Sequence, residues 1–275
     1  TAGSITLMLQ GVLLPCLFAP GKVTLNVTGG TCGTWQASVD YLQNVLLPQV
    51  QRFVDKVELK ILRRGYYPKG GGLVKLEISP RFSLKDYDSF DAFYDDIRAK
   101  TAKVSLLEQG KMEQIRGIVN VADELQSKQV GERIAQAAGS YLKEYNVPVN
   151  IRVEYDKAYS AGGELVLWAL FSQQGKMDYD NPVILGGDAL LERNKSSEMV
   201  AKEAVVELKV EIKSDAAVDA HLADQLIAFM ALLPGSSISA SMVTKHAQTN
   251  MYVVEKFLPI AFKVEKNVIY AEELA

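Results

Sequence analysis

Apolar residues recur along this chain with two periods, one typical of helices and one typical of strands. Residues 4–18 are apolar over a helical length, and residues 22–30 alternate as a strand does. A further helix is predicted over residues 34–54. Two strands, 57–64 and 73–80, follow it and are joined by the glycine-rich turn GYYPKGGG. The N-terminal part is therefore expected to run helix, strand, helix, strand, strand.

The C-terminal part repeats this order of elements. Its predicted helices cover residues 221–233 and 246–258, and its predicted strands cover residues 237–241, 260–266 and 268–273. We therefore predict two copies of one αβαββ unit, because a repeated order of elements decides the architecture. Helices on one face of a four-stranded sheet would bury the apolar side of each copy. The predicted fold class is α/β (α+β).

A different pattern separates the two copies. After an acidic, aromatic stretch, the segment 81–182 reads as strand, helix, strand, strand, which predicts an inserted small α/β domain. The main domain then consists of a repeat unit at 1–80 and a continuation with the last repeat unit at 183–275. The continuation contains a long helix that we expect to be capped near Asn194–Ser197.

Composition and charge narrow the possible functions. The chain has 275 residues, of which 48% are hydrophobic and 23% charged, so it can bury a sizeable core. Its net charge of −3 excludes a broad electrostatic coating of nucleic acid, although a local basic pocket could still hold one phosphate end. Cys16 and Cys32 are too few for a disulfide framework or a zinc site, which favours a reducing cytoplasm.

The start of the chain has two unusual features. The apolar stretch ITLMLQGVLLPCLFAP is interrupted by Gln10 and Pro15 well short of a spanning length, so we expect a buried helix and no membrane partner. The chain also begins at Thr1, without Met, inside a predicted structured element. We expect it to be a piece that lacks its true beginning.

His246 is one of only two histidines, and it lies where a predicted strand passes into a predicted helix. The positive end of the helix dipole favours neutral imidazole over imidazolium. Neutral imidazole has a free nitrogen and can act as a nucleophile. Position alone also fits a surface or capping histidine, and both interpretations remain open at this point.

Several motifs resemble one known family. RRGYYPKGGGLV, HLADQLIAFMAL and KHAQTNMYVVEKFL are similar to motifs of the RNA 3′-terminal phosphate cyclases. TAGSITLMLQGVLLP, VTGGT and LLERNKSSEMVAKEA agree in order and spacing, so the resemblance covers nearly the whole chain. It implies a large domain of repeated αβαββ units, as in enolpyruvyl transferases, with an inserted thioredoxin-like domain.

The resemblance to the catalytic branch of this family also implies a reaction. It is the ATP-dependent, ligase-type conversion of an RNA 3′-terminal phosphate into a 2′,3′-cyclic phosphate, through a covalent histidine–AMP and an RNA-adenylate. The partners would be RNA 3′-phosphate ends, and a divalent metal, Mg or Mn, would offset the phosphate charge. The matching nucleophile is His246, in TKHAQTN. No metal ligand can be assigned.

Five further residues lie at positions that correspond to the family's nucleotide site. Asp224 and Gln225 match an acidic–amide pair that lines it, although a polar pair near a helix start would serve without a ligand. Gln10, a polar break in an apolar helix, matches a glutamine near the nucleotide. His221 replaces an aromatic that stacks on adenine in some relatives, but simple surface exposure also explains it. Tyr41 matches an aromatic near the base, and core packing is its more ordinary role.

The turn between the two predicted strands carries basic and aromatic residues. Arg63, Arg64 and Lys69 could hold a terminal phosphate, and the neighbouring tyrosines could stack on bases. A twisted hairpin with glycines at its bend explains the same residues structurally.

Two other functions remain open. A non-catalytic, cyclase-like RNA-binding protein of ribosome assembly would keep the fold, but the HxxTN pattern at His246 is expected only of the catalytic branch. An enolpyruvyl transferase would share the repeat but needs no covalent histidine. The family's glycine-rich opening and first repeat, which supply phosphate-binding arginines and a metal-binding glutamate, have no counterpart in these residues.

Overall fold

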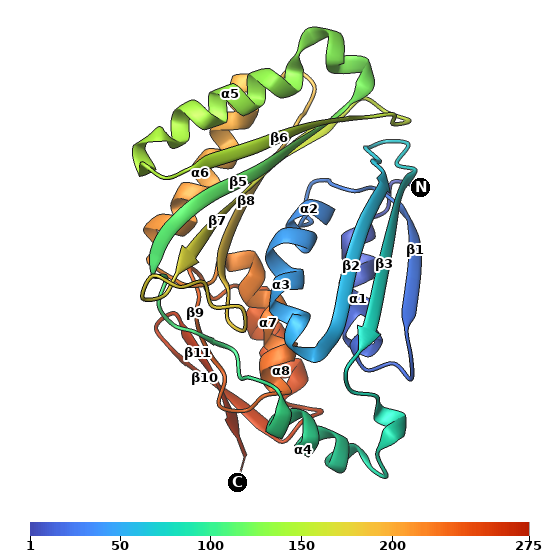
Figure 1. Cartoon of the computed structure of the whole chain (residues 1–275), viewed down its shortest axis with the longest axis vertical. Coiled ribbons are helices and arrows are strands. Elements are labelled where there is room, and N and C mark those ends of the chain that lie inside the picture. Colours follow the sequence, from blue (N-terminus) through green and yellow to red (C-terminus); the bar gives the residue numbers. More distant parts are fainter. Residues whose placement is uncertain (275) are drawn as a thin grey trace.

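The computed structural model describes residues 1–274 and shows a mixed α/β protein with three sheets (Figure 1). The first sheet has the strand order β1 (Val23–Gly29), β3 (Gly72–Pro80), β2 (Val54–Arg63). The second has the order β10 (Ile260–Glu265), β11 (Val268–Glu273), β9 (Ser237–Ser239), β4 (Ser105–Leu106). The third has the order β6 (Val149–Asp156), β5 (Lys111–Ala122), β7 (Gly163–Ser172), β8 (Val183–Leu190).

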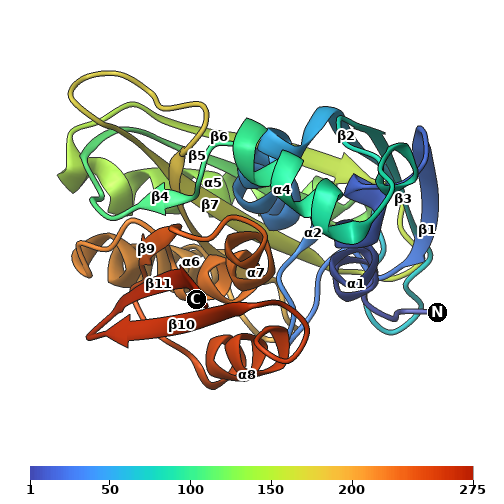
Figure 2. The same cartoon turned by 90° about the horizontal axis from the view of Figure 1, so that it is seen from below.

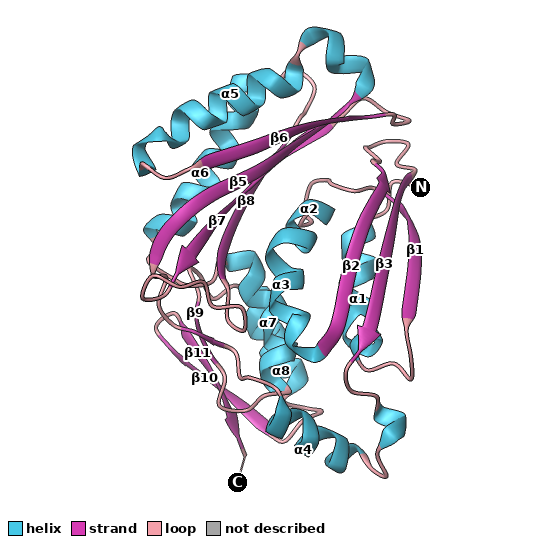
Figure 3. Cartoon of the chain, viewed as in Figure 1, coloured by secondary structure: helices cyan, strands magenta, loops and turns pink. Residues whose placement is uncertain are grey.

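The helices lie between and around these sheets, as Figure 3 shows by secondary structure. The longer ones are α1 (Ile5–Leu17), α4 (Phe90–Lys100), α5 (Val130–Leu142), α6 (Ser197–Lys213), α7 (Ala220–Ala231) and α8 (Lys245–Val254). The helices α5 and α6 cover the outer face of the third sheet, and α7 and α8 pack together beside the second (Figure 2). The predicted cap of the long helix is found in α6, where Ser196 Oγ accepts a hydrogen bond from the Met199 amide.

The first and last parts of the chain share one topology. In each, two outer strands pair antiparallel with the last strand of the segment, giving β1–β3–β2 and β9–β11–β10. Isolated parallel bridges, Ser4 with Gly30 and Val218 with Ala240, also occupy corresponding places. The first sheet has three strands within residues 1–274, whereas the second gains a fourth, β4, from the middle of the chain. Descent from a repeat stays a prediction.

The helix predicted over residues 34–54 begins later and is irregular. It starts after Ser38, whose Oγ accepts from the Tyr41 amide at 3.1 Å, and it comprises α2 (Val39–Tyr41), a π-helical turn, α3 (Leu47–Val50) and a final 3₁₀ turn. Pro48 has no N–H to donate to the preceding turn, which disfavours regular α-helix there. Upstream of this break, the side-chain amide of Asn44 donates to the Asp40 carbonyl at 2.8 Å.

The third sheet extends past the predicted insert. Its edge strand β8 follows residue 182 and pairs antiparallel with β7, so the residues after 182 do not leave the sheet. Two adjacent glycines let β8 be covered closely on both faces. A Cβ at Gly186 would lie 2.4 Å from the Tyr41 ring, and one at Gly187 would lie 2.6 Å from the backbone of Leu208 in α6. Every residue of β7 is buried between these layers.

A buried polar cluster joins the third sheet to the N-terminal elements. The Arg64 guanidinium donates to both carboxylate oxygens of Asp40, and its NH2 group also reaches Glu154 at 2.9 Å. Asn120 of β5 donates to Asp40 at 3.2 Å and to Glu164 at 3.4 Å. Burial raises the pKa of Glu164 well above its usual range, and nearby carboxylates raise it further, which favours a protonated carboxyl.

Replacement of Arg64 by Met should destabilise the fold strongly, because it leaves Asp40 buried without its counter-charge. We expect urea unfolding to show a loss of about 3–5 kcal/mol in the free energy of unfolding. Arg133→Met is the matched control, since its ion pair with Glu198 is half exposed and should be worth less than about 1 kcal/mol. Equal losses in the two variants would contradict the role given to burial.

Candidate active site

A cavity of about 300 Å³ lies between α1, α7 and α8. Its wall is mostly apolar, and four polar side chains face it: Gln10, Asp224, Gln225 and Asn250. Three of these four were predicted from two separate sequence motifs, and the structure brings them together. Asn250 was not predicted, although it lies four residues after His246, one turn further along the same helix face. A mostly apolar cavity with a few convergent polar groups is typical of a small-molecule site.

Asp224 is held by the start of α8. Thr244, the N-cap of α8, donates its hydroxyl proton to Asp224 Oδ1 and accepts from the Ala247 amide at 3.0 Å. The Asn250 side chain donates to the Asp224 backbone carbonyl at 3.1 Å. These contacts fix α8 against α7, and with it the position of His246.

Gln225 has an unused hydrogen-bond acceptor. Its side-chain nitrogen donates to the His221 carbonyl at 3.4 Å, while its Oε1 is buried and has no partner within residues 1–274. An unpaired buried acceptor costs free energy, so such groups usually have a reason. An N–H donor on a bound ligand, such as the exocyclic amine of adenine, would satisfy this oxygen.

His246 is the second residue of α8 and is exposed. It does not line the cavity itself, but lies one turn before Asn250, which does. The first turn of a helix presents unpaired N–H groups and the positive end of the dipole, which stabilise phosphate groups nearby. A ligand that fills the cavity could therefore place a phosphate near this histidine.

The structure does not bring His221 into the cavity. Its Nε2 lies 3.7 Å from Glu207 of α6, which is the distance of an ion pair rather than a hydrogen bond, and its ring meets the Tyr41 ring edge-on at 6.1 Å. Glu207 raises the pKa of His221 to about 9, and Asp219 adds to this. Tyr41 is buried and donates to Asp219 at 2.6 Å, which confirms a core role.

The hairpin arginines are held by structural contacts. Arg64 is buried in the polar cluster, so the hypothesis that it holds a terminal phosphate is wrong for this residue. Arg63 donates its Nε–H to the Gly71 carbonyl at 2.6 Å, as expected for a twisted hairpin. Lys69 remains exposed, with no ion-pair partner in the described part of the chain.

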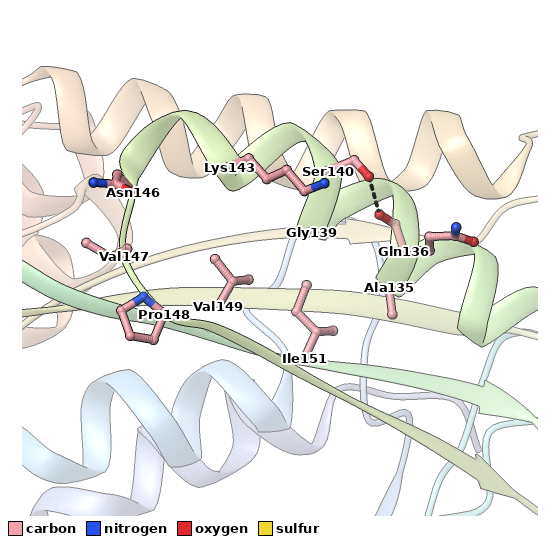
Figure 4. A pocket seen from close by; sticks show the side chains of 10 residues that line it. All are labelled: Ala135, Gln136, Gly139, Ser140, Lys143, Asn146, Val147, Pro148, Val149 and Ile151. Carbon is pink, nitrogen blue, oxygen red and sulfur yellow. Dashed lines mark hydrogen bonds between the residues drawn. The ribbon is translucent and has the colours of Figure 1, made fainter.

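A separate groove of about 760 Å³ lies between α5 and β6 (Figure 4). It is lined by apolar and uncharged polar residues, with Lys143 as its one charged side chain, and contains none of the predicted site residues. No group of three or more His, Cys, Asp or Glu residues is arranged to hold a metal ion anywhere in residues 1–274. Among the helices described, none is long and apolar enough to cross a membrane.

The chain is similar to proteins of one family. The model of the family "RNA 3'-terminal phosphate cyclase" matches residues 1–264. RNA 3′-terminal phosphate cyclases of Archaeoglobus fulgidus, Pyrococcus abyssi and Pyrococcus furiosus are 39%, 37% and 36% identical to it over 98% of its length. The matched regions cover 72%, 70% and 70% of these relatives.

The pKa of His221 should depend on Glu207. We expect NMR titration to give a value of about 9, and Glu207→Gln to return it toward the ordinary value near 6.5. Because the folded pKa is raised, the ion pair stabilises the fold fully below pH 6.5 and loses that effect as the pH rises through about 9. Glu203→Gln, which removes a partner of Lys195 instead, should leave the His221 titration unchanged. A His221 pKa that stays at about 9 in Glu207→Gln would contradict this assignment.

Proposed function

Since the chain belongs to the RNA 3′-terminal phosphate cyclase family, we propose that it converts RNA 3′-phosphate ends into 2′,3′-cyclic phosphates at the expense of ATP, with His246 as the nucleophile. The family membership rests on a match over residues 1–264. The observation in the structure that supports the proposal is the cavity between α1, α7 and α8, which opens beside the helix that carries His246.

The cavity has groups suited to the nucleoside of ATP. The unpaired Oε1 of Gln225 can accept from the adenine amine, and the free carboxylate oxygen of Asp224 can accept from a ribose hydroxyl. Gln10 and Asn250 offer both donors and acceptors on either side. Apolar walls from Leu13, Leu14 and Phe229 suit the faces of a base.

The proposed reaction proceeds in three displacements. An imidazole nitrogen of His246 attacks the α-phosphorus of ATP, so that a nitrogen–phosphorus bond forms and pyrophosphate leaves. An oxygen of the RNA 3′-phosphate then attacks the same phosphorus and releases the histidine. Finally the neighbouring 2′-hydroxyl attacks the RNA phosphorus, loses its proton and displaces AMP. Each step exchanges one phosphorus bond for another, which replaces a difficult direct condensation.

A divalent ion, Mg or Mn, would offset the charge of the phosphates in such a reaction. The described residues offer no group of three carboxylate, histidine or cysteine ligands for one. His221 contacts Glu207 and Tyr41 and does not line the cavity. Its proposed effect on nucleotide binding is therefore indirect.

The architecture is proposed to be that of the family. The shared strand order of β1–β3–β2 and β9–β11–β10 supports two copies of an αβαββ unit. The third sheet, with β5 and β6 parallel across α5 and β7 and β8 antiparallel, supports an inserted thioredoxin-like unit. We propose that this unit begins at β5, after β4 has joined the second sheet, and extends through β8 and α6.

His246→Ala should abolish covalent capture of AMP and leave the fold intact, because the nucleophilic nitrogen is lost and the side chain is exposed. The measurement is label retained on the denatured protein after incubation with α-labelled ATP. His221→Ala is the matched control and should weaken nucleotide binding only modestly. Undiminished label on His246→Ala would contradict the mechanism. If the unaltered chain captured no AMP, the result would instead indicate a non-catalytic binding protein.

Gln225→Leu should change stability and nucleotide binding in opposite directions. Removal of the unpaired buried oxygen should leave the free energy of unfolding equal or higher. Loss of one hydrogen bond to the base, worth about 1–1.5 kcal/mol, should weaken ATP binding about tenfold in calorimetry. Gln136→Leu, an exposed substitution in the groove of Figure 4, is the control. Unchanged ATP affinity in Gln225→Leu would place the base elsewhere.

A further inference from the structure

Two adjoining cavities form one groove beside the turn that joins β2 to β3. Their volumes are about 890 and 740 Å³, and both are lined by Pro68, Gly162 and Arg193. We call this combined space the hairpin groove. Its walls come from the β2–β3 turn, from the loop between β6 and β7, and from the segment between β8 and α6, together with the loop after β1 and the segment from the end of β5 into α5. It lies near the N-terminus, toward the end of the molecule away from α8 (Figure 1).

The hairpin groove is basic in an acidic chain. Five basic residues line it against two acidic ones, Glu124 and Glu192, while the whole chain has a net charge of −3. Arg133 and Lys195 are paired with glutamates. Within residues 1–274, Lys69, Lys128 and Arg193 have no ion-pair partner, and all three are exposed. Unpaired cations collected in one groove favour a polyanionic ligand.

Two tyrosines present flat surfaces in the same groove. Tyr67 is 81% exposed and Tyr159 is 56% exposed. The Arg63 guanidinium lies 4.9 Å from the centre of the Tyr159 ring and supports it from one side. Exposed aromatic rings beside unpaired cations are the combination by which single-stranded nucleic acids are held, through stacked bases and contacted phosphates.

We infer that the hairpin groove binds the single-stranded body of the RNA, upstream of the end that reacts beside α8. This assignment rests on the proposed function for the identity of the substrate. It gives the third sheet a part in RNA binding, because the β6–β7 loop and the β8–α6 segment form a large share of the wall. An acidic peptide would use the cations but would not need the two exposed rings.

The test neutralises the three unpaired cations together, in Lys69→Gln, Lys128→Gln, Arg193→Gln. Binding of a fluorescent single-stranded RNA of about 15 nucleotides is followed by anisotropy, without ATP, over a range of salt. Loss of three phosphate contacts should weaken binding about 50-fold at about 0.15 M salt and reduce the slope of log affinity against log salt by about 2. Tyr67→Ala should weaken binding about tenfold with an unchanged salt slope.

The control triple variant is Lys85→Gln, Lys176→Gln, Lys202→Gln. These lysines are exposed, have no ion-pair partner in the described residues and lie outside the groove. It removes the same charge and should leave RNA affinity within about twofold. Capture of AMP from labelled ATP should be unchanged in both triple variants, because the nucleotide cavity is separate. Failure of AMP capture in the unaltered protein would contradict the proposed function, whereas the RNA-binding test would still apply because it is carried out without ATP.

Four outcomes would overturn the inference. The groove variant could bind RNA with unaltered affinity and salt slope, or the control variant could lose as much. The loss could be confined to RNA that carries a 3′-phosphate, which would make the groove the site of the reacting end. Polyglutamate could compete as well as RNA does, which would identify an acidic protein segment as the occupant instead.

Discussion

The buried ion pair between Arg64 and Asp40 is the contact on which the arrangement of this molecule depends. Arg64 directly follows β2, and Asp40 lies in the first turn of the irregular helix. Asn120 of the third sheet donates hydrogen bonds to Asp40 and to Glu164, so the third sheet joins the same cluster. Two charges removed from water are stable only when each has its partner, so the cluster tolerates few alternative arrangements. The three elements are thereby fixed relative to one another, and the turn after β2 and the loops of the third sheet that line the hairpin groove are positioned with them.

The candidate active site depends on a second, smaller joint. Thr244 both caps α8 and contacts Asp224, so the start of the helix and the wall of the cavity are set by one hydroxyl group. This arrangement leaves His246 exposed on a helix whose position is fixed. A nucleophile that must meet a phosphorus atom from one direction benefits from such a rigid support more than from burial.

Much of the fold followed from hydrophobic period, because long apolar stripes have few alternatives. The stripe Ile5, Leu9, Leu13, Leu17 makes α1 predictable, and strand order within each segment agrees with the predicted elements. The late start of the helix at Val39 and its π-helical turn were not predictable from period, since they follow from a cap and from Pro48. Membership of β8 in the third sheet rests on its antiparallel pairing with β7, the strand before it in the chain, which the apolar pattern of either strand alone does not record. The prediction that Gln10, Asp224 and Gln225 lie together came from the family resemblance. The buried ion pair between Arg64 and Asp40 is a tertiary contact that the residues next to Arg64 in the sequence do not indicate.

The paired glycines of β8 carry a consequence for how the chain is made. Gly186 accepts the ring of Tyr41 on one face of the strand, while Gly187 accepts α6 on the other. During translation, the helix around Tyr41 is synthesised long before β8, the strand that covers it. Until β8 emerges, the apolar side of that helix has only incomplete cover, at the stage when nascent chains are most exposed to misassociation. The helix around Tyr41 can bury its apolar side fully only after β8 has been translated, well over a hundred residues later.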